Sequence, residues 1–69
     1  MNKRIYIEGM SCNHCVMHVK NALLENIKIK EVEVSLEGKY AKIIINEEIS
    51  KEEIVKIITD LGYEVKEIV

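Results

Sequence analysis

The sequence of 69 residues contains no proline, tryptophan or phenylalanine, and only three glycines, three tyrosines and two cysteines. Without Trp or Phe, it lacks the large rings on which nucleic-acid bases usually stack. The net charge is −2, with acids and bases interspersed, so no basic patch predicts binding to nucleic acid or to an anionic membrane. We therefore expect no nucleic-acid partner.

Long apolar runs are also absent from the sequence. Residues 1–4 are followed by alternating polar and apolar residues, which is typical neither of a signal peptide nor of a membrane-spanning segment. We therefore expect no direct membrane insertion and a cytoplasmic protein, in which thiols stay reduced and serve as ligands or redox groups.

Hydrophobic residues, mostly Ile and Val, make up 48% of the chain, without linkers or low-complexity stretches. A chain of this size buries only about 60% of its unfolded surface, so its stability depends on a clean apolar pattern. We predict a single domain that covers residues 1–69.

Four segments alternate between apolar and polar residues, the period of a strand with one buried face. Their apolar positions are Ile5 and Ile7; Val32, Val34 and Leu36; Ala41, Ile43 and Ile45; and Tyr63, Val65 and Ile68. Glu37–Lys39 is predicted to form a hairpin turn, in which Gly38 is free to take a positive φ.

Two segments have helical spacing instead. The first runs over 13–25, with Val16, Val19, Ala22 and Leu23 on one face, and Ile27 is predicted to plug its end. The second begins at a predicted capping box, in which Ser50 and Glu53 satisfy each other's amides, and it ends at Gly62. Its inner stripe is Ile54, Ile57, Ile58 and Leu61.

The predicted element order is β-α-β-β-α-β. Two split βαβ units of this order form an α+β, ferredoxin-like fold, a four-stranded antiparallel sheet with both helices on one face. In this topology the start of the first helix, the hairpin at Gly38 and the turn before Tyr63 lie at one end of the molecule. The connections 26–30 and 46–50 lie at the other end.

The two cysteines, Cys12 and Cys15, stand at that first end, where a strand passes into a helix. Side chains three apart on a helix have Cβ atoms about 5–6 Å apart, and two metal–sulfur bonds of roughly 2.3 Å span a similar gap. The positive helix end and its free amides lower thiol pKa values. The spacing therefore predicts a two-coordinate S–metal–S site.

Two thiolates and a low coordination number select a soft monovalent ion, so we predict Cu(I) as the bound metal. Ag(I) would bind likewise and Hg(II) is chemically plausible, whereas Zn(II) prefers four ligands. We expect Cys15 to lie at the edge of the core and Cys12 to be more exposed. An open site of this kind releases its ion when an incoming thiolate adds before an old one leaves.

Residues near the cysteines are predicted to support the site rather than to ligate. Met10 faces inward beneath the loop, Gly9 supplies backbone freedom, and Tyr63 shields the sulfurs or donates a hydrogen bond to them. His14 is predicted to point to solvent. The alternative is that it tunes the thiols or joins a metal in a dimer. His18 is predicted to be an exposed helix residue.

The string Gly-Met-Ser-Cys-Asn-His-Cys at residues 9–15, with Leu-Gly-Tyr at 61–63, resembles the heavy-metal-associated (HMA) domain family. It is most similar to the small bacterial copper chaperones of the CopZ type. The resemblance covers the whole chain. It implies the ferredoxin-like fold, Cu(I) bound by Cys12 and Cys15, and transfer to the metal-binding domains of a copper-transporting P-type ATPase. It also implies a buried Met10, a Tyr63 close to the metal and, as a further partner, a copper-sensing repressor.

The leading prediction is thus a copper chaperone that is not an enzyme. A thiol–disulfide oxidoreductase with Cys12 as nucleophile is the first alternative, against which stands the absence of any proline for a cis-Pro loop. A mercury- or zinc-binding domain of a detoxification system is the second. We expect a monomer without metal, and a copper-bridged dimer stays open.

Overall fold

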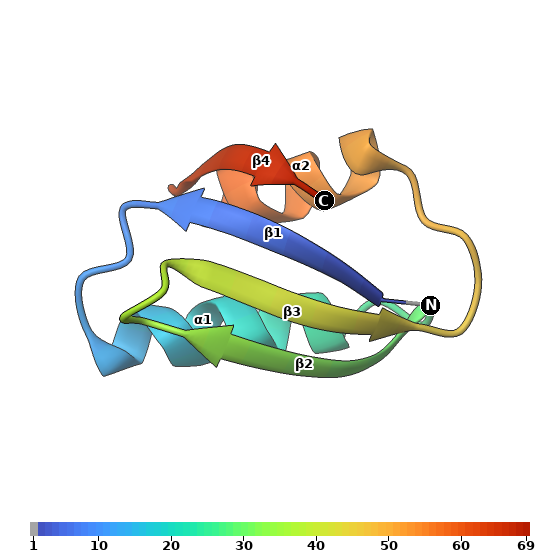
Figure 1. The fold of residues 1–69 in the computed structure, drawn as a ribbon, viewed down its shortest axis with the longest axis horizontal. Coiled ribbons are helices and arrows are strands. Elements are labelled where there is room, and N and C mark those ends of the chain that lie inside the picture. The colour runs from blue at the N-terminus through green and yellow to red at the C-terminus, as the bar shows by residue number, and fades with distance from the viewer. Residues whose placement is uncertain (1) are drawn as a thin grey trace.

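The computed structural model describes residues 2–69 and has the predicted order of elements. The elements are β1 (Asn2–Glu8), α1 (Asn13–Leu24), β2 (Ile29–Ser35), β3 (Tyr40–Ile45), α2 (Lys51–Asp60) and β4 (Glu64–Ile68). The strands form one antiparallel sheet in the order β2-β3-β1-β4. Both helices pack on the same face of this sheet (Figure 1). The predicted α+β, ferredoxin-like fold is confirmed.

The core lies between the sheet and the two helices, and the apolar alternation explains it. Ile5, Ile7 and Ile43 of the central strands share one buried cluster with Ile54 and Ile58 of α2, and all five are at most 1% exposed. Each such side chain contributes about 1.5–3 kcal/mol when it leaves water. Among residues 2–69 no polar or charged residue is buried.

The predicted capping box at α2 is only half formed. The Ser50 Oγ accepts a hydrogen bond from the Glu53 amide at 3.1 Å. The Glu53 carboxylate, however, accepts from Asn26 Nδ2 at 2.7 Å and lies 3.4 Å from Lys28 Nζ. This carboxylate therefore ties the α1–β2 connection to α2 instead of reaching back to the Ser50 amide, because two better donors face it.

The prediction that Ile27 plugs the end of α1 is wrong, because this side chain is 89% exposed. The Asn26 Oδ1 accepts a hydrogen bond from the Lys28 amide at 2.9 Å, which holds the chain in a tight turn there. β2 then begins at Ile29, within the connection predicted for 26–30, and Ile29 is buried in the role expected of Ile27.

The hairpin turn between β2 and β3 also differs from its prediction. The residue with positive φ is Lys39, at +59°, and not Gly38. Gly38 is required for space instead, because a Cβ there would lie 2.4 Å from Cε2 of the Tyr40 ring. Its amide donates to the Ser35 Oγ at 2.9 Å, which closes the turn.

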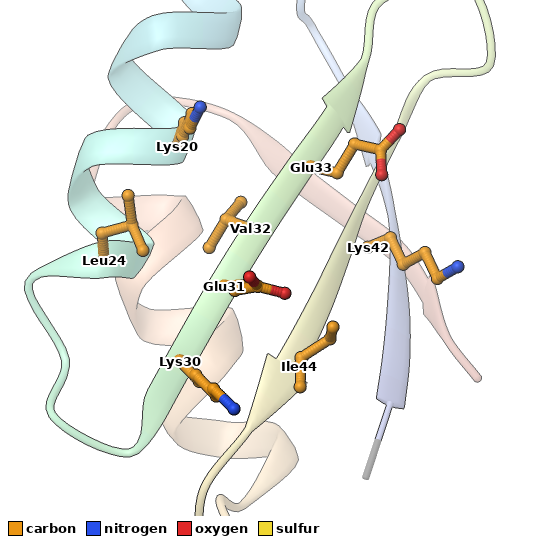
Figure 2. Close-up of a pocket in the computed structure, with 8 residues that line it drawn as sticks. All are labelled: Lys20, Leu24, Lys30, Glu31, Val32, Glu33, Lys42 and Ile44. Atoms are coloured by element: carbon orange, nitrogen blue, oxygen red, sulfur yellow. The ribbon is translucent and has the colours of Figure 1, made fainter.

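An open groove of about 530 Å³ runs along β2, with residues of α1 on one side of this strand and residues of β3 on the other (Figure 2). It is lined by Lys20, Leu24, Lys30, Glu31, Val32, Glu33, Lys42 and Ile44. Alternating charges along an edge strand oppose pairing with other chains. The cysteines do not line this groove, so it forms no part of the site below. No helix within residues 2–69 is long and apolar enough to cross a membrane.

Candidate metal-binding site

The site lies where three connections meet at one end of the sheet, as the topology predicts. These are the β1–α1 loop, the β2–β3 turn and the α2–β4 turn, all on the left in Figure 1. A hydrogen bond of 2.9 Å from the Ile7 amide to the Lys39 carbonyl joins the end of β1 to the hairpin. The end of β1, from which the loop between Gly9 and Cys12 starts, is therefore held against the hairpin.

The two cysteines sit on the first turn of α1. Cys12 is the N-cap residue, with extended backbone, and its carbonyl accepts from the amides of Cys15 and Val16 at 3.1 and 3.3 Å. Its own side chain makes no capping hydrogen bond. The two Sγ atoms lie 3.4 Å apart, with Cys12 exposed and Cys15 half-buried against the core. The predicted difference in exposure is confirmed.

Hydrogen-bond donors around the Cys15 sulfur lower its pKa to about 6 from an ordinary value of 9.0. The largest effect comes from the backbone amide of Ser11, followed by the hydroxyl of Tyr63 and the thiol of Cys12. Such donors favour the charged form of the thiol. The same contact raises the pKa of Tyr63, because its hydroxyl donates to the Cys15 thiolate.

Tyr63 reaches the sulfur because α2 ends in a Schellman motif. The amide of Gly62, at φ +95°, donates to the Thr59 carbonyl at 3.0 Å, and the Tyr63 amide donates to the Ile58 carbonyl at 3.3 Å. This turn reverses the chain and brings Tyr63 next to Gly9 of the β1–α1 loop. The cap of the second helix thus positions a hydroxyl at the start of the first.

Gly9 has a second role besides backbone freedom. Its φ of +106° is one that L-residues rarely adopt, and a Cβ there would lie 3.2 Å from Cδ1 of Tyr63. The tyrosine ring therefore packs against the bare backbone of the loop. The sequence indicates that Gly9 needs conformational freedom, but nothing in it reveals this ring contact.

The other predicted neighbours divide into core and surface. Met10 is 8% exposed and belongs to the core beneath the loop, as expected. His14 and His18 both lie on the exposed surface of α1. In the described residues 2–69, no hydrogen bond joins either imidazole to a thiol. The structure therefore brings Tyr63 and Met10 to the cysteines, and leaves His14 beside them in sequence but facing solvent.

The sequence predicts that free amides at the helix start lower the thiol pKa values, but it does not single out the amide of Ser11. Its residue type carries no signal, because every non-proline residue in that position would supply the same amide. The signal is positional: an amide just before a helix lacks an intrahelical partner and is free to bind a sulfur anion.

The spacing of the sulfurs sets the geometry of any ion between them. With metal–sulfur bonds of roughly 2.3 Å, a linear arrangement requires about 4.6 Å between sulfurs, some 1.2 Å more than the 3.4 Å observed. A bent arrangement fits directly, and rotation of the exposed Cys12 side chain would open the pair to a linear one. Within residues 2–69 no group of three or more His, Cys, Asp or Glu side chains is placed to hold a metal.

Comparison with known sequences identifies relatives of this chain. The sequence profile of the heavy-metal-associated domain matches residues 4–64. A copper-transporting ATPase of Helicobacter pylori is 42% identical over 67 residues, which are 96% of this chain but only 9% of the ATPase. The copper chaperone CopZ of Staphylococcus haemolyticus is 37% identical, covering 96% of this chain and 98% of the chaperone.

Two further proteins, one of them of known structure, are similar to this chain. A mercuric reductase of Shewanella putrefaciens is 43% identical over 61 residues, which are 88% of this chain and 11% of the reductase. The solved structure of a CopZ metallochaperone superposes with a TM-score of 0.89 at 27% identity, covering 96% of this chain and all of that one. The fold, the profile match and these relatives agree: the chain belongs to the heavy-metal-associated domain family.

Proposed function

We propose that this chain is a Cu(I) carrier with no catalytic step of its own. One observation carries the proposal: two sulfur atoms 3.4 Å apart stand at an accessible helix start, and the Cys15 thiol has a pKa of about 6. At neutral pH, Cys15 is therefore mostly a thiolate, the form that ligates metal. A soft anionic ligand pair on two side chains suits Cu(I) better than harder divalent ions.

Transfer of the ion follows from the unequal exposure of the two sulfurs. Cys12 is exposed, whereas Cys15 is half-buried and accepts hydrogen bonds from Ser11 and Tyr63. An incoming thiolate adds to the ion from the open side, and the Cys12 sulfur leaves first because fewer contacts hold it. The ion is then shared between Cys15 and the acceptor before it moves on, as in thiol–disulfide exchange.

The acceptor we propose is a metal-binding domain of a copper-transporting P-type ATPase. Similarity to the ATPase of H. pylori, together with similarity to CopZ over nearly its whole length, supports donor and acceptor domains of one fold. Residues 1–69 then act as a single carrier domain in the cytoplasm, where thiols remain reduced. A copper-sensing repressor is a second acceptor to include in transfer assays.

Mercury is the second candidate cargo, favoured by similarity to the mercuric reductase and by the affinity of thiolates for soft ions. A thiol–disulfide oxidoreductase is disfavoured, because the sequence has no proline to form the cis-Pro loop that faces the cysteines in thioredoxin-like enzymes. Assays of disulfide reduction distinguish that activity from metal transfer.

The direct test is competition for Cu(I) between the reduced protein and a chelator of known affinity, under anaerobic conditions. Cys12→Ser and Cys15→Ser should each weaken binding by more than the roughly 10–100-fold typical of changes outside the ligand set. Ser11→Ala is the matched control, because it alters the same loop but keeps the backbone amide that faces Cys15. A Cys12→Ser variant with full affinity would refute the carrier mechanism.

Parallel titrations with Zn(II) and Hg(II) define the metal. We expect Zn(II) to bind the thiols far more weakly than Cu(I), and equal affinities would overturn the copper assignment. Native mass spectrometry with limiting Cu(I) gives the stoichiometry. One ion per chain supports the monomeric carrier, whereas one ion per two chains indicates a dimer bridged by copper.

A further inference from the structure

The exposed face of α1 carries a pair of imidazoles that the thiol site does not use. His14 and His18 are both exposed and stand four residues apart within α1. Residues with this spacing lie on one helix face, with Cβ atoms about 5–6 Å apart. Met17, between them in sequence, is 59% exposed, so no neighbouring element covers this part of the helix.

We propose that His14 and His18 form a second metal site, a two-imidazole chelate for a borderline divalent ion such as Zn(II) or Cu(II). Imidazole suits these ions, and two histidines at positions i and i+4 are the spacing by which helical His-x-x-x-His motifs hold zinc. Within residues 2–69 no third His, Cys, Asp or Glu joins the pair, so water completes the coordination.

The charges around His14 and His18 should make their affinity for a metal ion lower than that of the two thiols. His14 lies in the first turn of α1, where the positive end of the helix opposes a cation. The nearest lysine in the sequence, Lys20, lines the groove beside β2 (Figure 2), so its ammonium is on another side of the helix. The chelate thus lacks the anionic charge that Cys15 offers, and it takes harder ions than the thiolate pair.

The two sites are chemically distinct although they share one helix. Cys15 packs against the core, whereas both imidazoles face solvent. A titration of the wild-type chain with Zn(II) would therefore report the imidazole pair in addition to any binding at the sulfurs. This inference does not depend on the proposed carrier function.

The test uses Zn(II) as the probe and the full chain with Cys12→Ser and Cys15→Ser, so that no thiol competes. Histidine ring resonances in NMR spectra should shift together for both residues and saturate at one Zn(II) per chain. His18→Ala should weaken binding at least about tenfold, because the second ligand of a chelate acts at high effective concentration.

The matched control moves an imidazole instead of removing it. His18→Ala combined with Asn21→His keeps two histidines on α1, but seven residues and about 10.5 Å apart along the helix axis. Its affinity should equal that of His18→Ala alone. Full Zn(II) affinity in either variant would overturn the proposal, since binding would then not require the one-turn spacing.

Wild-type protein alkylated at both thiols repeats the test without the serine substitutions, should these disturb the fold. The outcomes also separate the two proposals. Loss of the imidazole chelate leaves Cu(I) affinity at the thiols unchanged, and failure of the thiols to bind Cu(I) leaves the Zn(II) titration of the histidines unchanged.

Discussion

Replacing Gly9 with alanine tests whether the cysteine loop is shaped by the Tyr63 ring as well as by backbone freedom. A Cβ at Gly9 would sit at φ +106° and 3.2 Å from Cδ1 of Tyr63. Gly62 is the matched control, because its φ is similar, at +95°, and a Cβ there would have nothing within 4 Å. The two variants thus share the backbone strain and differ in the ring contact.

The expected magnitudes follow from these two terms. Alanine at a sparsely populated positive φ costs about 1–3 kcal/mol, so both variants should lose stability in that range. For a domain of this size, each kcal/mol lowers the Tm by roughly 4–8 °C. Gly9→Ala should lose more than Gly62→Ala, and it should also raise the pKa of Cys15, because the displaced ring withdraws its hydroxyl from the sulfur.

Urea unfolding in reducing buffer measures the stabilities, and the pH dependence of Cys15 alkylation, followed by peptide mass spectrometry, measures its pKa. A double-mutant cycle sharpens the comparison: with Tyr63→Ala, the extra cost of Gly9→Ala over Gly62→Ala should vanish. Equal losses in the two single variants, with an unchanged Cys15 pKa in Gly9→Ala, would refute the reasoning.

Three further predictions follow from the described contacts. Folding lowers the pKa of Cys15 to about 6 from 9.0, so between these pH values the unfolded chain binds more protons than the folded chain. The free energy of unfolding should therefore rise with pH across this range. This contribution is lost as pH falls through about 6, and urea midpoints of reduced Cys15→Ser should lack the rise. Lys39→Gly should stabilise the chain by about 0.5–1 kcal/mol in thermal unfolding, because it relieves a side chain at φ +59°. Ser50→Ala should cost about 1 kcal/mol in urea unfolding, because α2 loses its N-terminal cap. Glu53→Gln should cost less, because it keeps the backbone amide of residue 53 and one acceptor for Asn26. The reverse order would show that the tether to the α1–β2 connection matters more than the cap.

The fold is readable from the sequence because its signals are local and agree with one another. Alternation at Ile5 and Ile7, a stop at Gly62 and the Ser50 cap each specify one element, and the element order then restricts the topology. Prediction from the sequence fails where several hydrogen-bond donors compete for one acceptor. The carboxylate of Glu53 had two candidate acceptor roles, and the choice depends on Asn26, which is distant in sequence and lies beside it only after folding.

The candidate site likewise has one part that the sequence predicts and one part that it does not. The positions of Cys12 and Cys15 follow from the strand–loop–helix pattern, and their difference in exposure follows from the helical register. The environment of the Cys15 sulfur follows only in part. The topology predicts Tyr63 at this end and free amides at the helix start, but it does not say that the amide of Ser11 is the one that faces the sulfur. The glycine at position 9 shows the limit most plainly, since its ring contact has no sequence signal.

The position of the thiols at one end of the core predicts that the fold survives their removal. Cys12 is exposed and Cys15 only borders the core, whose buried members are apolar side chains on the sheet and the two helices. Serine at both positions removes no fully buried group, so the double variant should keep its circular dichroism spectrum and lose no more than about 5 °C in Tm at a pH below 6. Above pH 6 the wild type should gain on the variant, because only the wild type has a thiolate for the amide of Ser11 and the hydroxyl of Tyr63 to stabilise. A variant that unfolds already at low pH would mean that the sulfurs support the fold itself, and the separation between a stable core and an exchangeable site would be wrong.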